Sequence, residues 1–131
     1  MPHTLPPYAL ASPSFRFRHL ANLAGRAPIG GAREVALACF VAARLAAESV
    51  GTLGEDPEAR AARAVAARTW LGTLALPSAV KSPVLRCAEL SGNGAAAVMG
   101  REVSGMAMAA SNWLDAPSRA ELEALATSLR A

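Results

Sequence analysis

This sequence has few of the residues on which most enzymes and metal proteins depend. It contains two histidines, two cysteines and one tyrosine in 131 residues. Neither His3 nor His19 belongs to a Glu-x-x-His pair of the kind that di-iron bundles use, and no Cys-x-x-Cys motif is present. Cys39 and Cys87 stand in apolar surroundings, where we expect buried free thiols. Because the phosphate-loop and Gly-x-Ser-x-Gly patterns are also missing, the sequence favours no catalytic activity, cofactor or metal.

Long uncharged runs are equally scarce. Arg44, Arg68, Arg101 and Glu102 interrupt the apolar stretches, and no uncharged run approaches the roughly 18 residues of a membrane-spanning helix. The first residues lack the basic start of a signal peptide, and prolines break their apolar run. We therefore expect a cytoplasmic protein with no membrane span.

Alanine takes the place of the missing large side chains. The chain has 32 alanines against three phenylalanines, two tryptophans and one tyrosine, and 53% of its residues are hydrophobic. A chain of this length and apolar content can bury one core, and that core must form by close approach of backbones. The net charge of +3 is only mildly basic, and 12 of the 13 basic residues are arginine.

Proline and glycine divide the chain into an arm and a series of helices. Residues 1–13 carry four of the nine prolines, which predicts an extended arm ahead of a single helical domain at 14–131. The predicted helices run from Ser12-Pro13 to Gly25, from Ala32 to Val50, from Asp56-Pro57 to Pro77, from Ser82-Pro83 to Leu90, from Ala95 to Leu114, and from a Ser118 to Glu121 capping box to Leu129. For the first of these, alternation around Phe15 and Phe17 also permits a short strand. The fold class expected is all-α, a compact five- to six-helix bundle-like domain.

The helix predicted over Ala32 to Val50 has two apolar sides. Small residues occupy one face, while Leu37 and Val41 stand among charges on the other. Arg44 and Glu48 are spaced to pair at i,i+4. An apolar pair framed by charges is typical of a contact surface, so these four residues form a candidate self-association interface. The alternative is that another helix of the same chain covers them.

The segment from Ala95 to Leu114 shows the same two-sidedness, and we expect it to be the central helix. One apolar stripe comprises Met99, Val103, Met106, Ala110 and Trp113, and the second side carries Val98, Ser104, Gly105, Met108 and Ala109. Glycine inside a helix costs about 0.5–1 kcal/mol relative to alanine. We therefore interpret Gly100, Ser104 and Gly105 as a site of close helix packing.

Arg101 and Glu102 lie in the middle of this predicted helix, where an unpaired buried charge is costly. We expect them to be paired, to reach solvent or to line a site, and Glu34, Glu48 or Glu89 could pair with Arg101. The pocket that the helix could contribute comprises Met99, Arg101, Glu102, Met106 and Trp113. Methionines at this spacing are also typical of plain core.

Three hypotheses for function follow from these patterns. The first is a non-enzymatic helical module for protein–protein interaction or self-association, which binds itself or another helical protein, as in a bacterial assembly. The second is a DNA-associated domain with a helix-turn-helix-like unit at 64–90 and contacts from Arg60, Arg63, Lys81 and Arg86. Pro83 within its recognition helix and the small net charge weigh against it. The third is a small-ligand pocket lined by the residues of the preceding paragraph.

Overall fold

The computed structural model describes residues 17–26, 31–51, 56–93 and 95–130. Over these ranges the chain forms six helices and no strand, so the all-α bundle-like fold class is confirmed. They are α2 (Arg18–Arg26), α3 (Gly31–Gly51), α4 (Pro57–Gly72), α5 (Ser78–Ser91), α6 (Ala96–Ala109) and α7 (Ala116–Arg130). The predicted arm at 1–13, the Ser12-Pro13 cap and the alternative strand at Phe15 lie outside the described residues.

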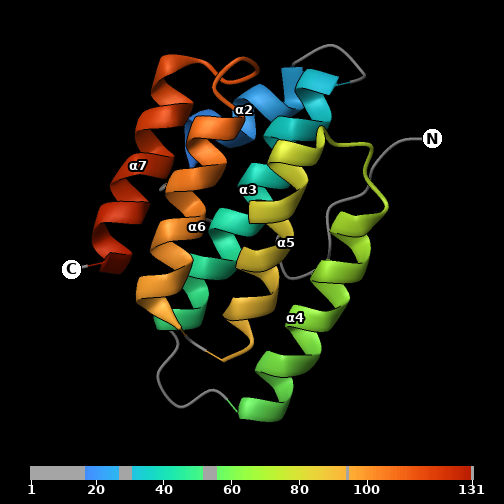
Figure 1. Ribbon diagram of the computed structural model, residues 1–131, viewed down its shortest axis with the longest axis vertical. Coiled ribbons are helices and arrows are strands. Elements are labelled where there is room, and N and C mark those ends of the chain that lie inside the picture. The colour runs from blue at the N-terminus through green and yellow to red at the C-terminus, as the bar shows by residue number, and fades with distance from the viewer. Residues whose placement is uncertain (1–16, 27–30, 52–55, 94, 131) are drawn as a thin grey trace.

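α3 is the centre of the bundle (Figure 1). It contacts all five other helices, although α4 lies at the edge and packs mainly along α5. All twelve residues from 35 to 46 of α3 are buried. The prediction that the segment from Ala95 to Leu114 is central is therefore wrong. The physical reason is that both faces of α3 are covered. Small side chains such as Ala38 and Ala42 allow close approach on one face, and larger ones such as Phe40 are buried on the other.

α6 is buried on one side only. Met99, Val103 and Met106 lie in the core, as the predicted stripe requires. The opposite side is open, because Gly105 is exposed and the side chain of Met108 is 76% exposed. The expectation that both sides of this helix are covered is wrong.

α4 begins where its sequence predicts. The side chain of Asp56 accepts a hydrogen bond from the backbone N–H of Glu58 (3.3 Å), and Pro57 occupies the first helical position. Proline is suited to that position because its missing N–H would have no partner within the helix. The predicted end at Pro77 is wrong, since α4 stops at Gly72.

α5 begins at Ser78, four residues before the predicted start at Ser82. The carbonyl of Pro77 accepts the backbone N–H of Lys81 (2.9 Å), which closes the first turn. Pro83 consequently lies inside the helix rather than at its start. A proline one turn in removes one backbone hydrogen bond, and the rest of the helix compensates by burying its apolar face.

The connection from α6 to α7 is longer than predicted. α6 ends at Ala109 instead of Leu114, and residues 110–114 form a turn. α7 then begins at Ala116, where the carboxylate of Asp115 accepts the backbone N–H of Ser118 (3.0 Å). Asp115, not Ser118, therefore caps this helix.

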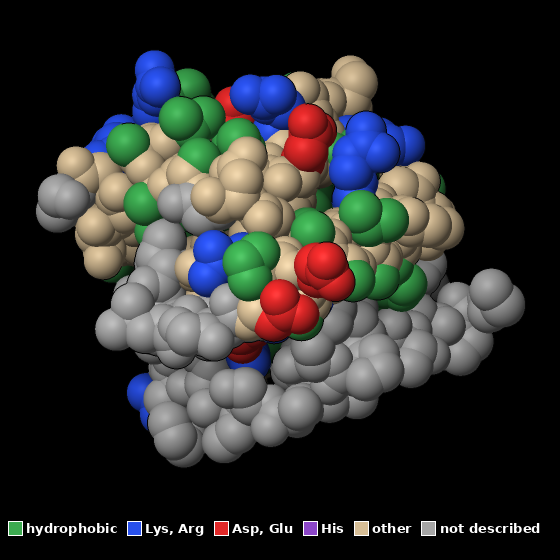
Figure 2. Space-filling view, turned by 90° about the horizontal axis from the view of Figure 1, so that it is seen from below, with side chains coloured by type: hydrophobic (Ala, Val, Ile, Leu, Met, Phe, Trp, Pro, Cys, Tyr) green, Lys and Arg blue, Asp and Glu red, His purple; other side chains and the backbone are tan. Residues whose placement is uncertain are grey.

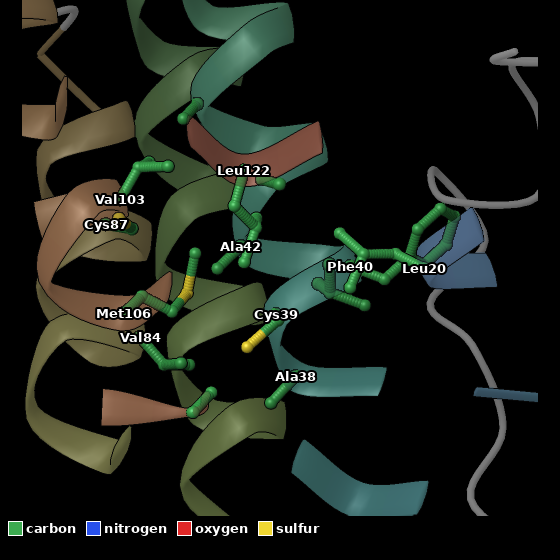
Figure 3. Packing of buried hydrophobic residues seen from close by; sticks show 14 of the residues in the cluster. Leu20, Ala38, Cys39, Phe40, Ala42, Val84, Cys87, Val103, Met106 and Leu122 are labelled. Carbon is green, nitrogen blue, oxygen red and sulfur yellow. The ribbon is translucent and has the colours of Figure 1, made fainter. Parts of the chain in front are cut away.

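Small and medium-sized apolar side chains from several helices fill the core (Figure 3). Cys39 of α3 lies among side chains of α5 and α6 that include Val84 and Met106, while Phe40 points the other way, towards Leu20 of α2. Cys39 and Cys87 are both buried and free, as predicted. Burial raises the pKa of the Cys39 thiol to about 12, and burial followed by the nearby Glu102 raises the pKa of Cys87 as well.

Gly100 lets α6 and α7 approach closely. A Cβ atom built on Gly100 would lie 2.7 Å from Arg130 Cγ, 3.0 Å from the carbonyl oxygen of Ala126 and 3.2 Å from Leu129 Cβ. The predicted close packing is present there. It is wrong for Gly105, where a Cβ would meet nothing within 4 Å.

These two glycines predict substitutions of opposite sign. Gly100→Ala should lower the free energy of unfolding by about 1–2 kcal/mol, because the backbone carbonyl of Ala126 cannot yield without moving α7. Gly105→Ala should raise it by about 0.5–1 kcal/mol, since alanine favours the helix and meets no neighbour. Urea denaturation followed by circular dichroism measures both. Equal effects of the two variants would contradict the observed α6–α7 contact.

The buried thiols predict protection from thiol reagents. Reagents of this kind attack the thiolate, and at pH 8 a thiol with a pKa of about 12 is almost entirely protonated. In the native protein neither Cys39 nor Cys87 should react with a disulfide reagent, and both should react in concentrated guanidinium. The absorbance of the released thiol measures this. Rapid reaction of either cysteine in the native state would reveal an open path into the core.

Candidate interaction surface

Two acidic side chains, Glu121 and Glu34, hold backbone groups of other segments. The carboxylate of Glu121 accepts the backbone N–H groups of His19 (3.0 Å) and Leu20 (2.9 Å) at the start of α2. Glu34 accepts the N–H of Ala75 (2.8 Å) between α4 and α5. Carboxylates at such positions satisfy N–H groups that a helix or turn leaves without partners. These groups are therefore structural, and they do not form a paired acid and base.

The capping box predicted between Ser118 and Glu121 is wrong. Instead of returning to Ser118 within α7, the carboxylate of Glu121 crosses to α2. The other end of α2 is held by Arg33, whose guanidinium donates to the carbonyl of Gly25 (3.2 Å). An Arg26–Asp115 ion pair (3.0 Å) adds a third attachment. A helix of nine residues is too short to be stable alone, so these polar contacts fix its place.

The candidate interface on α3 is not a surface. The side chain of Leu37 is 7% exposed and that of Val41 is fully buried, so the expectation that they lie open is wrong. Arg44 and Glu48 do pair, with Arg44 Nη2 2.7 Å from Glu48 Oε1. The Arg44 guanidinium also lies 5.8 Å from the ring centre of Phe40. Another part of the same molecule covers this side of α3, which is the alternative that the sequence left open.

The residues of the candidate pocket are separated in the fold. Met99 and Met106 are fully buried in the core, whereas Arg101 is exposed. Glu102 lies 3.9 Å from the guanidinium of Arg86, and Trp113 is half buried. Glu34, Glu48 and Glu89 each bond to other groups, Ala75, Arg44 and Arg68. Arg101 therefore avoids the free-energy cost of a buried unpaired charge, because its side chain reaches solvent.

The candidate nucleic-acid contacts do not gather on a projecting helix. Arg60, Arg63 and Lys81 are half buried, and Arg86 lies against Glu102. α5 runs back along α4 as an antiparallel hairpin and also packs on α3 and α6 (Figure 1). A recognition helix has to project so that it can enter a groove of DNA, whereas α5 packs against α3, α4 and α6 and is exposed on one side only. Figure 2 shows basic and acidic side chains interspersed on the end of the molecule where α4 and α6 begin.

The surface that sequence reasoning missed is the outer side of α4. Only Ala64, Ala67 and Leu71 of this helix are fully buried, because its main neighbour is α5. The side chain of Val65 is 65% exposed. We define the α4 outer face as Glu58, Ala61, Ala62, Val65, Arg68 and Thr69, all of which are exposed.

A shallow groove of about 250 Å³ borders this face. It is lined by Ala61, Ala64, Val65, Arg68, Glu89, Gly92 and Asn93. Gly92 determines its depth, since a Cβ at that position would lie 3.1 Å from the Cβ of Ala64. Along the rim, Arg68 Nε lies 3.8 Å from Glu89 Oε2, with the two side chains 56% and 55% exposed. An exposed branched side chain therefore stands beside a hollow lined by small ones.

A second exposed apolar side chain, Met108, has a different setting. Met108 lies beside a groove of about 410 Å³ between α6 and α7. Polar side chains of Ser111, Arg119 and Glu123 line that groove with alanines. Met108 is near the end of α6, and polar side chains share its groove. The α4 outer face is therefore the stronger candidate for an interaction surface.

Comparisons with known proteins identify no relative: no family model, no curated protein and no solved structure matches this chain. Within the described ranges, no three histidine, cysteine, aspartate or glutamate side chains are grouped as a metal ion requires. In the same ranges no helix combines the length and hydropathy needed to cross a membrane.

The contact between Glu121 and α2 generates a prediction about stability. Glu121→Ala should lower the free energy of unfolding by about 1–2 kcal/mol, because two backbone N–H groups lose a charged acceptor. Glu123→Ala is the matched control on the same helix, where an exposed side chain should change stability by less than about 0.5 kcal/mol. Urea denaturation measures both. A loss confined to Glu123→Ala would contradict the assigned role of Glu121.

Proposed function

We propose that this chain is a non-enzymatic, helix-mediated protein-interaction module that docks through the α4 outer face and its groove. The observation that carries the proposal is the exposure of Val65, 65%, beside a groove lined by Ala61, Ala64 and Gly92. A partner that covers such a side chain removes apolar surface from water, and each Å² removed contributes about 25 cal/mol of binding free energy. A partner that fills the groove would gain this energy without any rearrangement of the bundle.

Small side chains on this face suit a helix as the partner. Helix axes approach to about 8–10 Å, and the lower end of that range requires small residues at the contact. Ala61, Ala62 and Thr69 surround Val65 on the exposed side of α4. A helix lying along α4 can therefore reach both the side chain of Val65 and the groove beside it.

The other two functional hypotheses have less support. Among the proposed nucleic-acid contacts, Arg86 lies near Glu102, so an acidic group offsets its charge. Binding to phosphates depends on uncompensated positive charge. The residues of the predicted ligand pocket lie in different surroundings, because Met99 and Met106 are buried in the core while Arg101 is exposed.

Position-specific photo-crosslinking tests the proposal. A photoreactive benzoylphenylalanine replaces Val65 in the full chain, which is then made in its native host and irradiated. We expect covalent adducts from position 65, whatever protein supplies the other half, because this side chain lies at the centre of the docking face. Mass spectrometry of the adducts identifies the partner and the residue that it contributes.

The matched control places the same amino acid at Thr127, an exposed position on α7. Adducts from position 65 should exceed those from position 127 and should fall when Ala61→Glu blocks the groove. The proposal fails if position 65 forms no adducts, if the two positions form them equally, or if Ala61→Glu leaves them unchanged.

A further inference from the structure

We infer that the partner of the α4 outer face is a second copy of this chain, bound as an antiparallel, two-fold symmetric pair of α4 helices. This inference rests on the proposed docking face and names its occupant. A two-fold contact requires one patch to be complementary to itself. The α4 outer face meets that requirement in both charge and shape.

The two ends of the α4 outer face carry opposite charges. Glu58 and Arg68 are ten residues apart, about 15 Å along a helix axis. In an antiparallel pair with the two-fold axis beside residue 63, Glu58 of each copy lies opposite Arg68 of the other. Arg68 is available for this contact, because its 3.8 Å approach to Glu89 leaves 56% of its side chain exposed. The acid and the base therefore meet twice in the pair.

The side chains of the two copies also fit in shape in the same register. Residue 65 of one copy then lies opposite residue 61 of the other, so that Val65 faces Ala61 twice. Ala61 lines the groove together with Ala64 and Gly92, which leaves room for the branched side chain. One register thus places a large side chain over small ones and opposite charges over each other. A parallel pair would instead place Glu58 on Glu58 and Arg68 on Arg68.

The size of the face sets the strength of the pair. α4 has 16 residues and is about 24 Å long, so a contact between two such helices buries less than about 1,200 Å² in total. Interfaces of that size are weak and transient. We therefore expect a reversible dimer with a dissociation constant of micromolar order, formed at high local concentration.

Charge reversal in sedimentation equilibrium tests the inference. The full chain should show a monomer–dimer equilibrium at concentrations up to about 500 µM. Glu58→Arg and Arg68→Glu should each weaken it about tenfold, because one reversal turns both attractions into repulsions. An equimolar mixture of the two variants should dimerise to within about threefold of the unchanged chain, because both pairs are restored between unlike copies.

Recovery in the mixture separates this register from a general loss of folding. Arg101→Glu is the matched control, since it reverses an exposed charge on α6 and should leave the equilibrium unchanged. Circular dichroism confirms that each variant is folded. A mixture that remains as weak as its components overturns the antiparallel register.

The outcomes also separate this inference from the proposed function. A chain that stays monomeric over the whole range overturns self-association. If position 65 nevertheless crosslinks to a different protein, the docking face is retained and its occupant is that protein. If both experiments fail, the docking face itself is wrong.

Discussion

The fold depends on one constraint, the burial of residues 35 to 46 of α3 on every side. Residues 35 to 46 include five alanines, and their small side chains allow close approach on one face, while Phe40 packs towards Leu20 of α2 on the other. Hydrophobic stabilisation here comes from many close contacts between small groups rather than from a few large aromatic ones. Gly100 repeats the same principle where α6 meets α7. The bundle is therefore stabilised by van der Waals contacts between closely packed helix backbones.

Polar groups contribute by fixing the ends of helices that packing alone leaves undetermined. Glu121 and Arg33 hold the two ends of α2, and Glu34 holds the connection before α5. The buried Arg44 is satisfied by Glu48 and by the ring of Phe40. Because these side chains bond within the molecule, the outer side of α4 is where a branched apolar side chain and two opposite charges remain available together.

Local patterns in the sequence predicted the helices, the Asp56-Pro57 start of α4 and the buried thiols. They did not predict which helix is central, because α3 and α6 both have two apolar sides and only packing decides between them. The long-range bond from Glu121 to α2 spans about a hundred residues, which no local capping rule can anticipate. The exposure of Val65 likewise depends on α4 having one main neighbour. The spacing of Glu58, Val65 and Arg68 places them on one face of the helix, which the sequence could have shown. The sequence could not show that this face points outward.

An alanine-filled centre has a consequence for how this chain can vary. At Ala36, Ala38, Ala42, Ala43 and Ala46, every replacement except glycine adds volume to a position with no spare room, and glycine weakens the helix. Natural variation at these positions should consequently be confined to about two or three types of amino acid. Positions on α4 such as Ala59 and Ala66 are exposed and escape that limit. Related sequences should therefore differ less at the buried alanines of α3 than at the exposed alanines of α4.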